Sequence, residues 1–215
     1  AQPRPHRAGG ALMYARWGKR GIDLLAATAL LLLLAPLLLA VAALVRLRLG
    51  APVLFTQMRA GRDGRPFRLF KFRSMTEGEA PDAQRLTPFG TRLRASGLDE
   101  LPQLLHVLRG EMSLVGPRPL PLAYLGHYSP RQALRLRARP GLAGPGVAAG
   151  RNAVPWQQRL EMDADYAADP PSLDSDVRLL LRTLRVWLAG RGSHAPGHAT
   201  MPPFQGQADQ DAGTG

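Results

Sequence analysis

The sequence has no cysteine, and lysine is scarce: only Lys19 and Lys71 among its 28 basic residues are lysines. The absence of cysteine excludes a disulfide scaffold, a cysteine metal site and a thiol nucleophile. The sequence contains no P-loop and no glycine-rich dinucleotide fingerprint, and its five histidines lack the spacing of metal ligands. Carboxylates and arginines are therefore the residues left to carry chemistry.

Negative charge is also scarce over most of the chain. The net charge is +12 over 215 residues, and residues 1–160 hold 24 of the 28 basic residues but 8 of the 16 acidic ones. A strongly basic region favours an anionic partner: nucleic acid, anionic lipid or a phosphorylated small molecule. The alternative is a solvated, arginine-rich surface that reflects compositional bias alone.

One long segment, residues 24–45, has no charged residue over 22 positions. A straight helix of this length would be about 33 Å long, which is enough to cross the hydrocarbon core of a bilayer. Pro36 divides the segment into residues 24–35 and 37–45, each too short to cross alone, and a proline kinks a helix.

Basic residues flank this segment on both sides, namely Arg16, Lys19 and Arg20 before it and Arg46, Arg48, Arg59 and Arg62 after it. Cationic flanks prefer the cytoplasmic side of a membrane, and a single crossing cannot place both flanks there. We therefore predict a re-entrant helix hairpin that bends at Pro36. A kinked single span is the alternative, because membrane helices tolerate proline.

Composition divides the chain into four parts. We expect a flexible tail over residues 1–15, a re-entrant membrane helix over 16–48, a main domain over 49–191 and a partly disordered C-terminal extension over 192–215. The predicted fold class is α+β and membrane-monotopic. The main domain is expected to be compact and mainly helical, with a short β-hairpin and interfacial amphipathic helices.

Local patterns predict the elements of the main domain. Runs of β-branched or aromatic residues at 52–57 and 67–72 flank the turn signal Asp63-Gly64, which predicts the β-hairpin. Helices are predicted over residues 87–98, 101–108, 130–139, 156–168 and 174–188. The last of these has an apolar face opposite three arginines, so it either lies on a membrane surface or packs on a core.

Asp99 and Glu100 form an adjacent acidic pair within a basic stretch. Adjacent carboxylates repel each other unless cations or a metal share their site. The pair suits a nucleophile beside a metal ligand, because a carboxylate can attack phosphorus and Mg²⁺ typically binds one or two carboxylates plus substrate phosphates. The alternative is a helix N-terminus, where the helix dipole favours acidic residues.

Several cations are placed to bind phosphate. Lys71 and Arg73 alternate with Phe70 and Phe72 on a predicted strand, so both cations share one face, and such a pair suits a diphosphate. Arg118 lies between two prolines, which limit nearby backbone freedom and suit a fixed phosphate ligand. The alternatives are an ordinary solvated strand face and a surface turn.

Together these pieces resemble a known family, the bacterial sugar transferases or monotopic phosphoglycosyl transferases. The motifs that carry the resemblance are KRGIDLL (19–25), APVLFTQMRAGRDGRPFRLFKFRSM (51–75), LDELPQLLHVLRGEMSLVGPRPL (98–120), RPGL (139–142), GRN (150–152) and GHATMPPF (197–204). Their order and spacing match from about residue 16 to residue 206. The match is to the compact, single-domain form of the family.

The resemblance implies an enzyme that transfers a sugar-1-phosphate from a UDP-sugar to polyprenyl (undecaprenyl) phosphate and releases UMP. It implies that Asp99 attacks the sugar-linked phosphate and carries a covalent phosphosugar, while Glu100 binds Mg²⁺ as cofactor. The family's basic, phosphate-holding positions match Lys71, Arg94, Arg118 and Arg151.

The resemblance also implies partners and a location. The partners are a UDP-sugar donor, a polyprenyl phosphate acceptor and the membrane, without nucleic acid, and a homo-oligomer is compatible with the family. Residues 49–191 would be a catalytic domain at the cytoplasmic face of the bacterial inner membrane. The reaction would initiate assembly of an exopolysaccharide, O-antigen, capsule or glycoprotein.

The chain departs from the family pattern at residues 143–149, where Pro145 replaces an aromatic residue and Val147 and Ala149 replace amides. We expect this loop to alter donor choice or weaken activity. Gly97 replaces the usual Ser or Thr before the LDE motif. Two alternative functions stay open at this point: a catalytically weakened relative that serves as a scaffold, and a membrane-anchored nucleic-acid-binding protein.

Overall fold

The computed structural model describes residues 13–169, 171–190, 192–195 and 197–206. Residues 1–12 of the predicted tail and 207–215 of the predicted C-terminal extension lie outside the described residues. The helices and strands are α2 (Lys19–Leu49), β1 (Leu54–Ala60), β2 (Pro66–Phe72), α3 (Asp82–Arg85), α4 (Pro88–Ser96), α5 (Leu104–Arg109), β3 (Ser113–Val115), α6 (Pro130–Ala133), β4 (Gly141–Ala143), α7 (Pro145–Ala148), α8 (Trp156–Ala168) and α9 (Leu173–Leu188). Single turns of π or 3₁₀ helix occur at Tyr14–Gly18, Arg62–Gly64, Leu98–Gln103, Leu122–His127, Leu134–Arg137 and Arg151–Ala153. The described residues form a mainly helical α+β fold with two small two-stranded sheets, in agreement with the predicted class.

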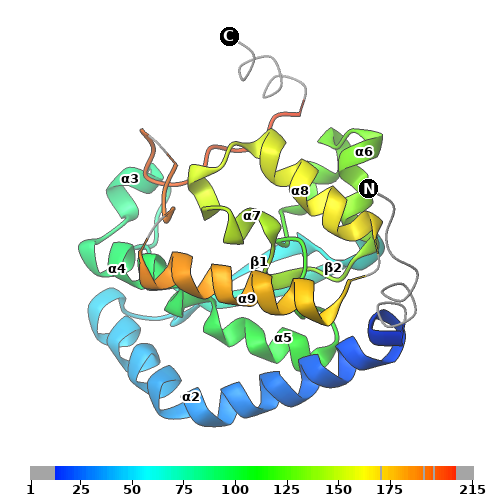
Figure 1. Cartoon of the computed structure of the whole chain (residues 1–215). Coiled ribbons are helices and arrows are strands. Elements are labelled where there is room, and N and C mark those ends of the chain that lie inside the picture. The colour runs from blue at the N-terminus through cyan, green and yellow to red at the C-terminus, as the bar shows by residue number, and fades with distance from the viewer. Residues whose placement is uncertain (1–12, 170, 191, 196, 207–215) are drawn as a thin grey trace.

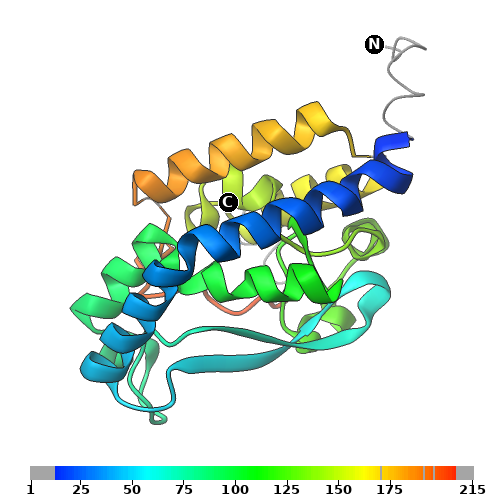
Figure 2. The same ribbon diagram turned by 90° about the horizontal axis from the view of Figure 1, so that it is seen from below.

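Helix α2 is continuous over 31 residues, with Pro36 inside it. It bends near its middle, and both of its ends lie on the same side of the bend (Figures 1 and 2). The structure therefore has one bent helix and does not show the separate arms of the hairpin that the sequence predicted. Proline removes one backbone hydrogen bond and crowds the preceding turn, which kinks the helix, while strong helix-forming leucine and alanine on both sides keep it helical.

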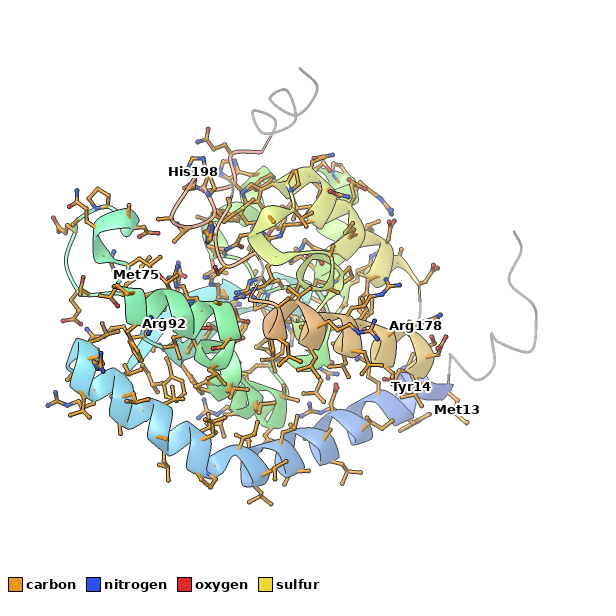
Figure 3. All side chains as sticks on the ribbon, turned by 60° about the vertical axis from the view of Figure 1, so that its left-hand side comes forward. Met13, Tyr14, Met75, Arg92, Arg178 and His198 are labelled. Atoms are coloured by element: carbon orange, nitrogen blue, oxygen red, sulfur yellow. The ribbon has the colours of Figure 1, made fainter. Side chains whose placement is uncertain are left out.

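Each half of α2 packs one side on the domain. Ala27 joins the core cluster that includes residues of α5 and β3, whereas Val41 and Val45 join a second cluster with Phe72 of β2 and Leu93 of α4. The opposite side exposes large apolar side chains, including those of Leu25, Leu32, Leu33, Leu39 and Leu47. Figure 3 shows side chains projecting from the outer side of the bend, away from the rest of the molecule. Among the described residues, α2 is the one helix long and apolar enough to cross a membrane.

Strands β1 and β2 form the predicted antiparallel hairpin. Asp63 at its tip has a φ of 56°, a left-handed conformation that aspartate tolerates better than most residues. Phe67, Leu69 and Phe72 of β2 are buried. Phe67 and Leu69 alternate with the exposed Arg68 and join one core cluster, whereas Phe72, on the opposite face, joins the second cluster. Both faces of the strand therefore contact part of the core.

The predicted helices of the second half are partly confirmed. Helix α8 has the predicted bounds, and α9 begins one residue before its predicted start. The helix predicted over 130–139 is wrong in length, because α6 ends at Ala133 and only a 3₁₀ turn follows to Arg137. Pro140 restricts the backbone of Arg139 to extended conformations, which accounts for the last predicted residue but not for the end at Ala133.

The C-terminal segment that the structure describes packs on α8. Phe204 is buried in a cluster with Leu120, Trp156 and Leu160. The indole Nε1 of Trp156 donates a hydrogen bond to the carbonyl of Pro202 at 2.9 Å. Residues 197–206 therefore belong to the folded domain.

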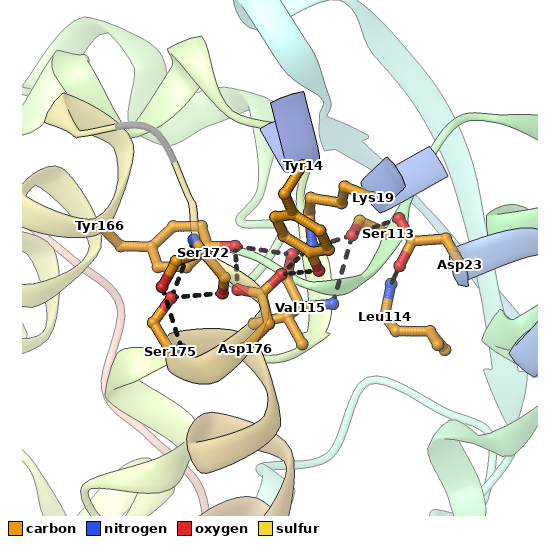
Figure 4. A network of polar contacts seen from close by, with 10 residues as sticks. All are labelled: Tyr14, Lys19, Asp23, Ser113, Leu114, Val115, Tyr166, Ser172, Ser175 and Asp176. Atoms are coloured by element: carbon orange, nitrogen blue, oxygen red, sulfur yellow. Dashed lines mark hydrogen bonds and ion pairs between the residues drawn. The ribbon is translucent and has the colours of Figure 1, made fainter. Parts of the chain in front are cut away.

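Buried polar contacts attach the N-terminal end of α2 to the domain (Figure 4). Asp176 of α9 accepts hydrogen bonds from the hydroxyls of Tyr14 (2.8 Å) and Tyr166 (2.9 Å) and from Lys19 Nζ (2.6 Å). Asp23 of α2 accepts one from the Ser113 hydroxyl (2.7 Å) and one from the Leu114 backbone N–H (3.2 Å). These contacts fix where the apolar helix leaves the domain.

Candidate active site

The end of β2 supplies two cations to one cavity. Lys71 and Arg73 both line it, as the alternation along the strand predicts, while Phe72 between them is buried. Arg73 Nη2 donates to the carbonyl of Leu49 at 2.5 Å, so the strand end is tied to the last residue of α2. The cavity therefore begins next to the apolar helix.

The acidic pair lies in the first turn of the 3₁₀ helix Leu98–Gln103. Gly97, directly before it, ends α4 with a φ of 72°, which is the left-handed conformation that glycine adopts without a steric cost. A Cβ atom at Gly97 would lie 2.6 Å from Cδ2 of Trp187 in α9. Glycine at this position therefore lets α9 pack against the turn that presents Asp99.

Asp99 faces Lys71, with 3.6 Å between Lys71 Nζ and Asp99 Oδ2. Asp99 is buried, and its Oδ1 atom has no hydrogen-bond partner among the described residues. Burial raises the pKa of Asp99 above its ordinary value of 3.8, against the opposing charge of Lys71, and burial lowers the pKa of Lys71. The result is a poorly solvated carboxyl group with one oxygen left open.

Glu100 is held differently from its neighbour. Arg118 donates two parallel hydrogen bonds to it, Nη1 to Oε2 at 2.9 Å and Nη2 to Oε1 at 2.5 Å. Burial alone would raise the pKa of Glu100, but the charge and hydrogen bonds of Arg118 outweigh it and lower the pKa to about 2. Glu100 is therefore a fixed, ionised carboxylate.

Two other arginines hold the backbone of the Pro-Arg-Pro turn that carries Arg118. Arg135 Nη2 donates to the carbonyl of Arg118 at 2.5 Å and also pairs with the buried Asp163 at 2.8 Å. Arg59 Nη1 donates to the carbonyl of Pro119 at 3.2 Å. The rigidity that the two prolines suggested in the sequence is thus reinforced by contacts from distant segments.

Arg94 and Arg151 approach the acidic pair without forming an ion pair in the described residues. Arg94 Nε donates to the Ser74 hydroxyl at 2.7 Å, and Arg151 Nη1 donates to the carbonyl of Ala95 at 3.3 Å. Arg151 has a φ of 57°, which is unfavourable for arginine and typical of functional sites. The carbonyl of Gly192 accepts from Asn152 N–H at 3.0 Å, so the C-terminal segment supports this strained turn.

One cavity of about 760 Å³ unites these groups. All seven predicted site residues line it, namely Lys71, Arg73, Arg94, Asp99, Glu100, Arg118 and Arg151. Eight basic and four acidic side chains line the cavity in all, which leaves an excess of positive charge. Such a lining suits a ligand with several negative charges, such as a diphosphate.

Two further buried cations of this cavity, Arg59 and Arg159, were missed by the sequence analysis. In the sequence Arg59 is a flanking charge of the apolar segment, and Arg159 lies within the helix predicted over 156–168. A single sequence gives no signal that would have placed them in the cavity. The third additional cation, Arg85, pairs with Asp82 at 3.9 Å.

The divergent loop lies elsewhere. Pro145 begins α7, and Val147 is buried. Among the described residues, Pro145, Val147 and Ala149 are not part of the cavity lining, whereas Asn152 a few residues later is. The expectation that this loop alters donor choice or weakens activity stays a prediction.

Comparisons with known proteins show what this chain is similar to. The pattern of the family "Bacterial sugar transferase" matches residues 14–190. The "Uncharacterized sugar transferase EpsL" of Bacillus subtilis (strain 168) is 43% identical over 197 residues, which are 89% of this chain and 97% of that protein.

Two relatives have names that state a reaction. The UDP-glucose:undecaprenyl-phosphate glucose-1-phosphate transferase of Caulobacter vibrioides is 43% identical over 182 residues, covering 77% of this chain and 68% of that protein. The UDP-N-acetylgalactosamine-undecaprenyl-phosphate N-acetylgalactosaminephosphotransferase of Aeromonas hydrophila is 38% identical over 188 residues, covering 81% of this chain and 44% of that longer protein. The match over residues 14–190 and these identities show that the chain belongs to the bacterial sugar transferase family.

Proposed function

We propose that this chain is a phosphoglycosyl transferase that moves a sugar-1-phosphate from a UDP-sugar to undecaprenyl phosphate and releases UMP. This reaction is the initiating step of polysaccharide assembly. The observation that carries the proposal is the buried Asp99–Glu100 pair, which lies in a cavity lined by eight cations. The sugar is left open, because the named relatives use different ones.

Asp99 is the proposed nucleophile. In the first step an Asp99 carboxylate oxygen bonds to the sugar-linked phosphorus, and the bond from that phosphorus to the UMP oxygen breaks with its electron pair. In the second step an oxygen of the lipid phosphate bonds to the same phosphorus, and the aspartyl–phosphorus bond breaks to restore the carboxylate. The open Oδ1 atom and the poor solvation of Asp99 support this role.

In this reaction a negative carboxylate must approach a negative diphosphate. The cations of the cavity reduce the repulsion between them. Lys71 lies 3.6 Å from Asp99 and is placed to stabilise charge on the transferred phosphoryl group. Arg94 and Arg151 approach the same acidic pair, and Arg73 lies at the end of the cavity next to α2. Together they would hold the sugar-linked phosphate of the donor.

The residues present fit a bound Mg²⁺ of the kind that the family generally uses. Among the described residues no cluster of three or more His, Cys, Asp or Glu side chains is placed to bind a metal by itself. Mg²⁺ commonly needs only one or two carboxylates, with the remaining ligands supplied by substrate phosphates and water. Glu100 would supply the protein ligand, and the ion would neutralise phosphate charge.

We further propose that α2 is re-entrant and that the domain lies on the cytoplasmic face of the bacterial inner membrane. Two observations support this topology: basic residues flank both ends of the apolar helix, and both ends lie on one side of its bend (Figure 1). The exposed leucines of α2 would face lipid, and the exposed leucines of α9 would lie at the interface.

The function is tested by UMP release in nanodiscs, with undecaprenyl phosphate, Mg²⁺ and a panel of UDP-sugars. We expect release that depends on one donor, is abolished by a chelator and is abolished in Asp99→Asn. Absence of release with every donor, from protein that is folded and in the membrane, would contradict the transferase and favour the scaffold. Salt-sensitive DNA binding that persists in Asp99→Asn would instead favour the nucleic-acid-binding protein.

A further inference from the structure

The cations of the cavity fall into two groups by their partners. Each of the four acidic side chains pairs with one cation, in the pairs Lys71–Asp99, Arg73–Glu77, Arg85–Asp82 and Arg118–Glu100. Four cations remain without an ion-pair partner among the described residues, namely Arg59, Arg94, Arg151 and Arg159. Arg94 and Arg151 act electrostatically on Asp99, whereas Arg59 and Arg159 lie within reach of the charge of Arg118.

Arg59, on β1, is positioned by neutral groups only. Its Nη1 donates to the carbonyl of Pro119 at 3.2 Å, and its Nη2 donates to Gln57 Oε1 at 2.6 Å. Its Nε atom is buried and has no hydrogen-bond partner among the described residues. The guanidinium is thus fixed in orientation but keeps unused donors at the cavity wall.

Arg159, on α8, is buried almost completely, with 4% of its surface exposed. Its guanidinium carbon lies 4.6 Å from the ring centroid of Trp156, and that indole is fixed by its hydrogen bond to Pro202. The Nη1 atom of Arg159 is buried without a hydrogen-bond partner in the described part of the chain. The side chain therefore lines the cavity with an unused, buried donor.

Burying two unpaired cations beside a third is costly without an anion to compensate them. Burial, followed by the charge of Arg118, lowers the pKa of Arg59 and of Arg159 to about 10. Both side chains remain charged at neutral pH, so the cost persists in the free protein. A bound dianion would remove it, and a planar guanidinium suits phosphate oxygens.

The order of the two displacements at phosphorus indicates which phosphates this group binds. Arg118 holds Glu100, the neighbour of the proposed nucleophile, and the charge of Arg118 acts on both Arg59 and Arg159, which line the same cavity. In an in-line displacement at phosphorus, the nucleophile and the leaving group lie on opposite sides. Asp99 is the nucleophile in the first step and the leaving group in the second, so the UMP phosphate and the lipid phosphate must occupy the same place in turn.

We propose that Arg59, Arg118 and Arg159 form one subsite for a phosphate monoester, occupied first by the phosphate of departing UMP and then by the phosphate of the acceptor lipid. This inference rests on the proposed function. It adds two binding residues, Arg59 and Arg159, and a shared use of one place by both substrates.

The first arm of the test measures binding of UMP without turnover. The affinity of UMP is measured by titration calorimetry with Asp99→Asn protein in nanodiscs, alone and combined with Arg59→Gln or Arg159→Gln. We expect each added change to weaken UMP binding about ten- to hundredfold, the effect of losing a hydrogen bond to a charged group. The matched control is Arg131→Gln, an exposed arginine that faces α8 from outside and pairs with Glu161, and it should leave the affinity unchanged.

The second arm measures the acceptor. The KM for undecaprenyl phosphate is determined in Arg59→Gln and Arg159→Gln proteins with an otherwise native Asp99, at saturating UDP-sugar. We expect this KM to rise about tenfold or more in both, again with no change in Arg131→Gln. Thermal unfolding checks each variant, and the two arginines lie on different elements, so a folding defect in one leaves the other as a test. Arg159→Lys, which keeps the charge, should recover part of the binding.

The outcomes separate this inference from the proposed function. Weaker UMP binding together with a higher lipid KM supports the shared subsite. An effect on UMP alone or on the lipid alone would overturn the shared use, and no effect on either would overturn the subsite, even if the native protein releases UMP. Failure of the native protein to release UMP from any donor would instead contradict the transferase function itself.

Discussion

Two of the buried carboxylates of this molecule, Asp176 and Asp99, have opposite surroundings. Asp176, at the anchor of α2, accepts hydrogen bonds from Tyr14, Lys19 and Tyr166, so both of its oxygens are used. Asp99, in the cavity, faces Lys71 at 3.6 Å and keeps Oδ1 without a partner among the described residues. Burial alone therefore does not distinguish a reactive carboxylate from a structural one.

The difference lies in what surrounds each group. A fully hydrogen-bonded buried carboxylate stabilises the fold, and an unsatisfied one costs free energy in the free protein. We expect a protein to keep such an unsatisfied carboxylate where a substrate supplies the missing partner. The comparison predicts that the two sites respond in opposite ways to the same chemical change, from carboxylate to amide.

Asp99→Asn should have the largest effect on activity. The amide cannot serve as the nucleophile, so we expect UMP release to fall by about a thousandfold or more. The free energy of unfolding should fall by less than in Asp176→Asn, because Oδ1 has no hydrogen-bond partner to lose and Lys71 lies 3.6 Å from the other oxygen. Turnover and thermal unfolding are measured on the same preparation, with the exposed hairpin-tip variant Asp63→Asn as the control of unchanged turnover. If Asp99→Asn lost as much unfolding free energy as Asp176→Asn, the role of Asp99 would be structural.

Asp176→Asn should show the reverse pattern. Loss of this charge leaves Lys19 without its ion-pair partner and weakens the bonds from both tyrosines, so we expect destabilisation by about 3 kcal/mol. Asp174→Asn on the same helix is the matched control, because Asp174 is exposed and pairs only with Arg178, and it should cost less than about 1 kcal/mol. Urea unfolding in detergent measures both, and equal costs would show that the anchor is unimportant.

Gly97→Ser tests how closely α9 fits the turn of Asp99. The new side chain meets Trp187 and requires a left-handed conformation, so we expect a loss of about 2 kcal/mol of stability. Gly126→Ser is the control, since a Cβ there meets no atom within 4 Å. Trp187→Leu in the Gly97→Ser background should recover part of the loss, and full additivity of the two changes would argue against the contact.

His106 extends the comparison to a third buried group and should have the smallest effect. Its Nδ1 lies 2.6 Å from Glu111 Oε2, and its Nε2 accepts the Phe70 backbone N–H at 3.1 Å, so the ring is needed in its neutral form. Burial lowers its pKa below the ordinary value of 6.5, and Arg109 adds to this while Glu111 opposes it.

The folded protein therefore binds a proton at His106 less readily than the unfolded chain does. The stabilising contribution is complete above pH 6.5 and decreases as the pH falls towards the lower folded pKa, by about 1.4 kcal/mol for each unit of pKa difference. Urea unfolding between pH 7.5 and 5.5 should show this decrease in native protein and a weaker dependence in His106→Gln. The exposed His198→Gln should keep the native dependence, and an unaltered slope in His106→Gln would exclude this histidine as its source.

Local patterns predicted the elements and the site residues that neighbour one another in sequence. The hairpin, the bounds of α8 and the shared face of Lys71 and Arg73 follow from alternation, turn residues and helical period. The acidic pair and Arg118 could be identified because they lie in recognisable motifs. Each of these features depends on a few adjacent residues.

The remaining features depend on contacts between distant segments. The partner of Asp176, Lys19, is 157 positions away, and neither residue carries a local sign of the other. Arg159 resembles any polar residue of an amphipathic helix until Trp156 and the C-terminal segment enclose it. Helix α2 continues through Pro36 because the strong helix formers around it outweigh the local kink. The position of a proline alone does not predict whether a helix bends or ends there.

The most direct test of the account is to look for the covalent phosphosugar on Asp99. Protein in nanodiscs is mixed with Mg²⁺ and its UDP-sugar without lipid acceptor, quenched, digested and examined by mass spectrometry. The account predicts that the peptide containing Asp99 gains the mass of one sugar-phosphate, that added undecaprenyl phosphate removes it, and that Asp99→Asn lacks it. An unmodified Asp99 peptide during active turnover, or a sugar-phosphate on another residue, would contradict the central role of this carboxylate.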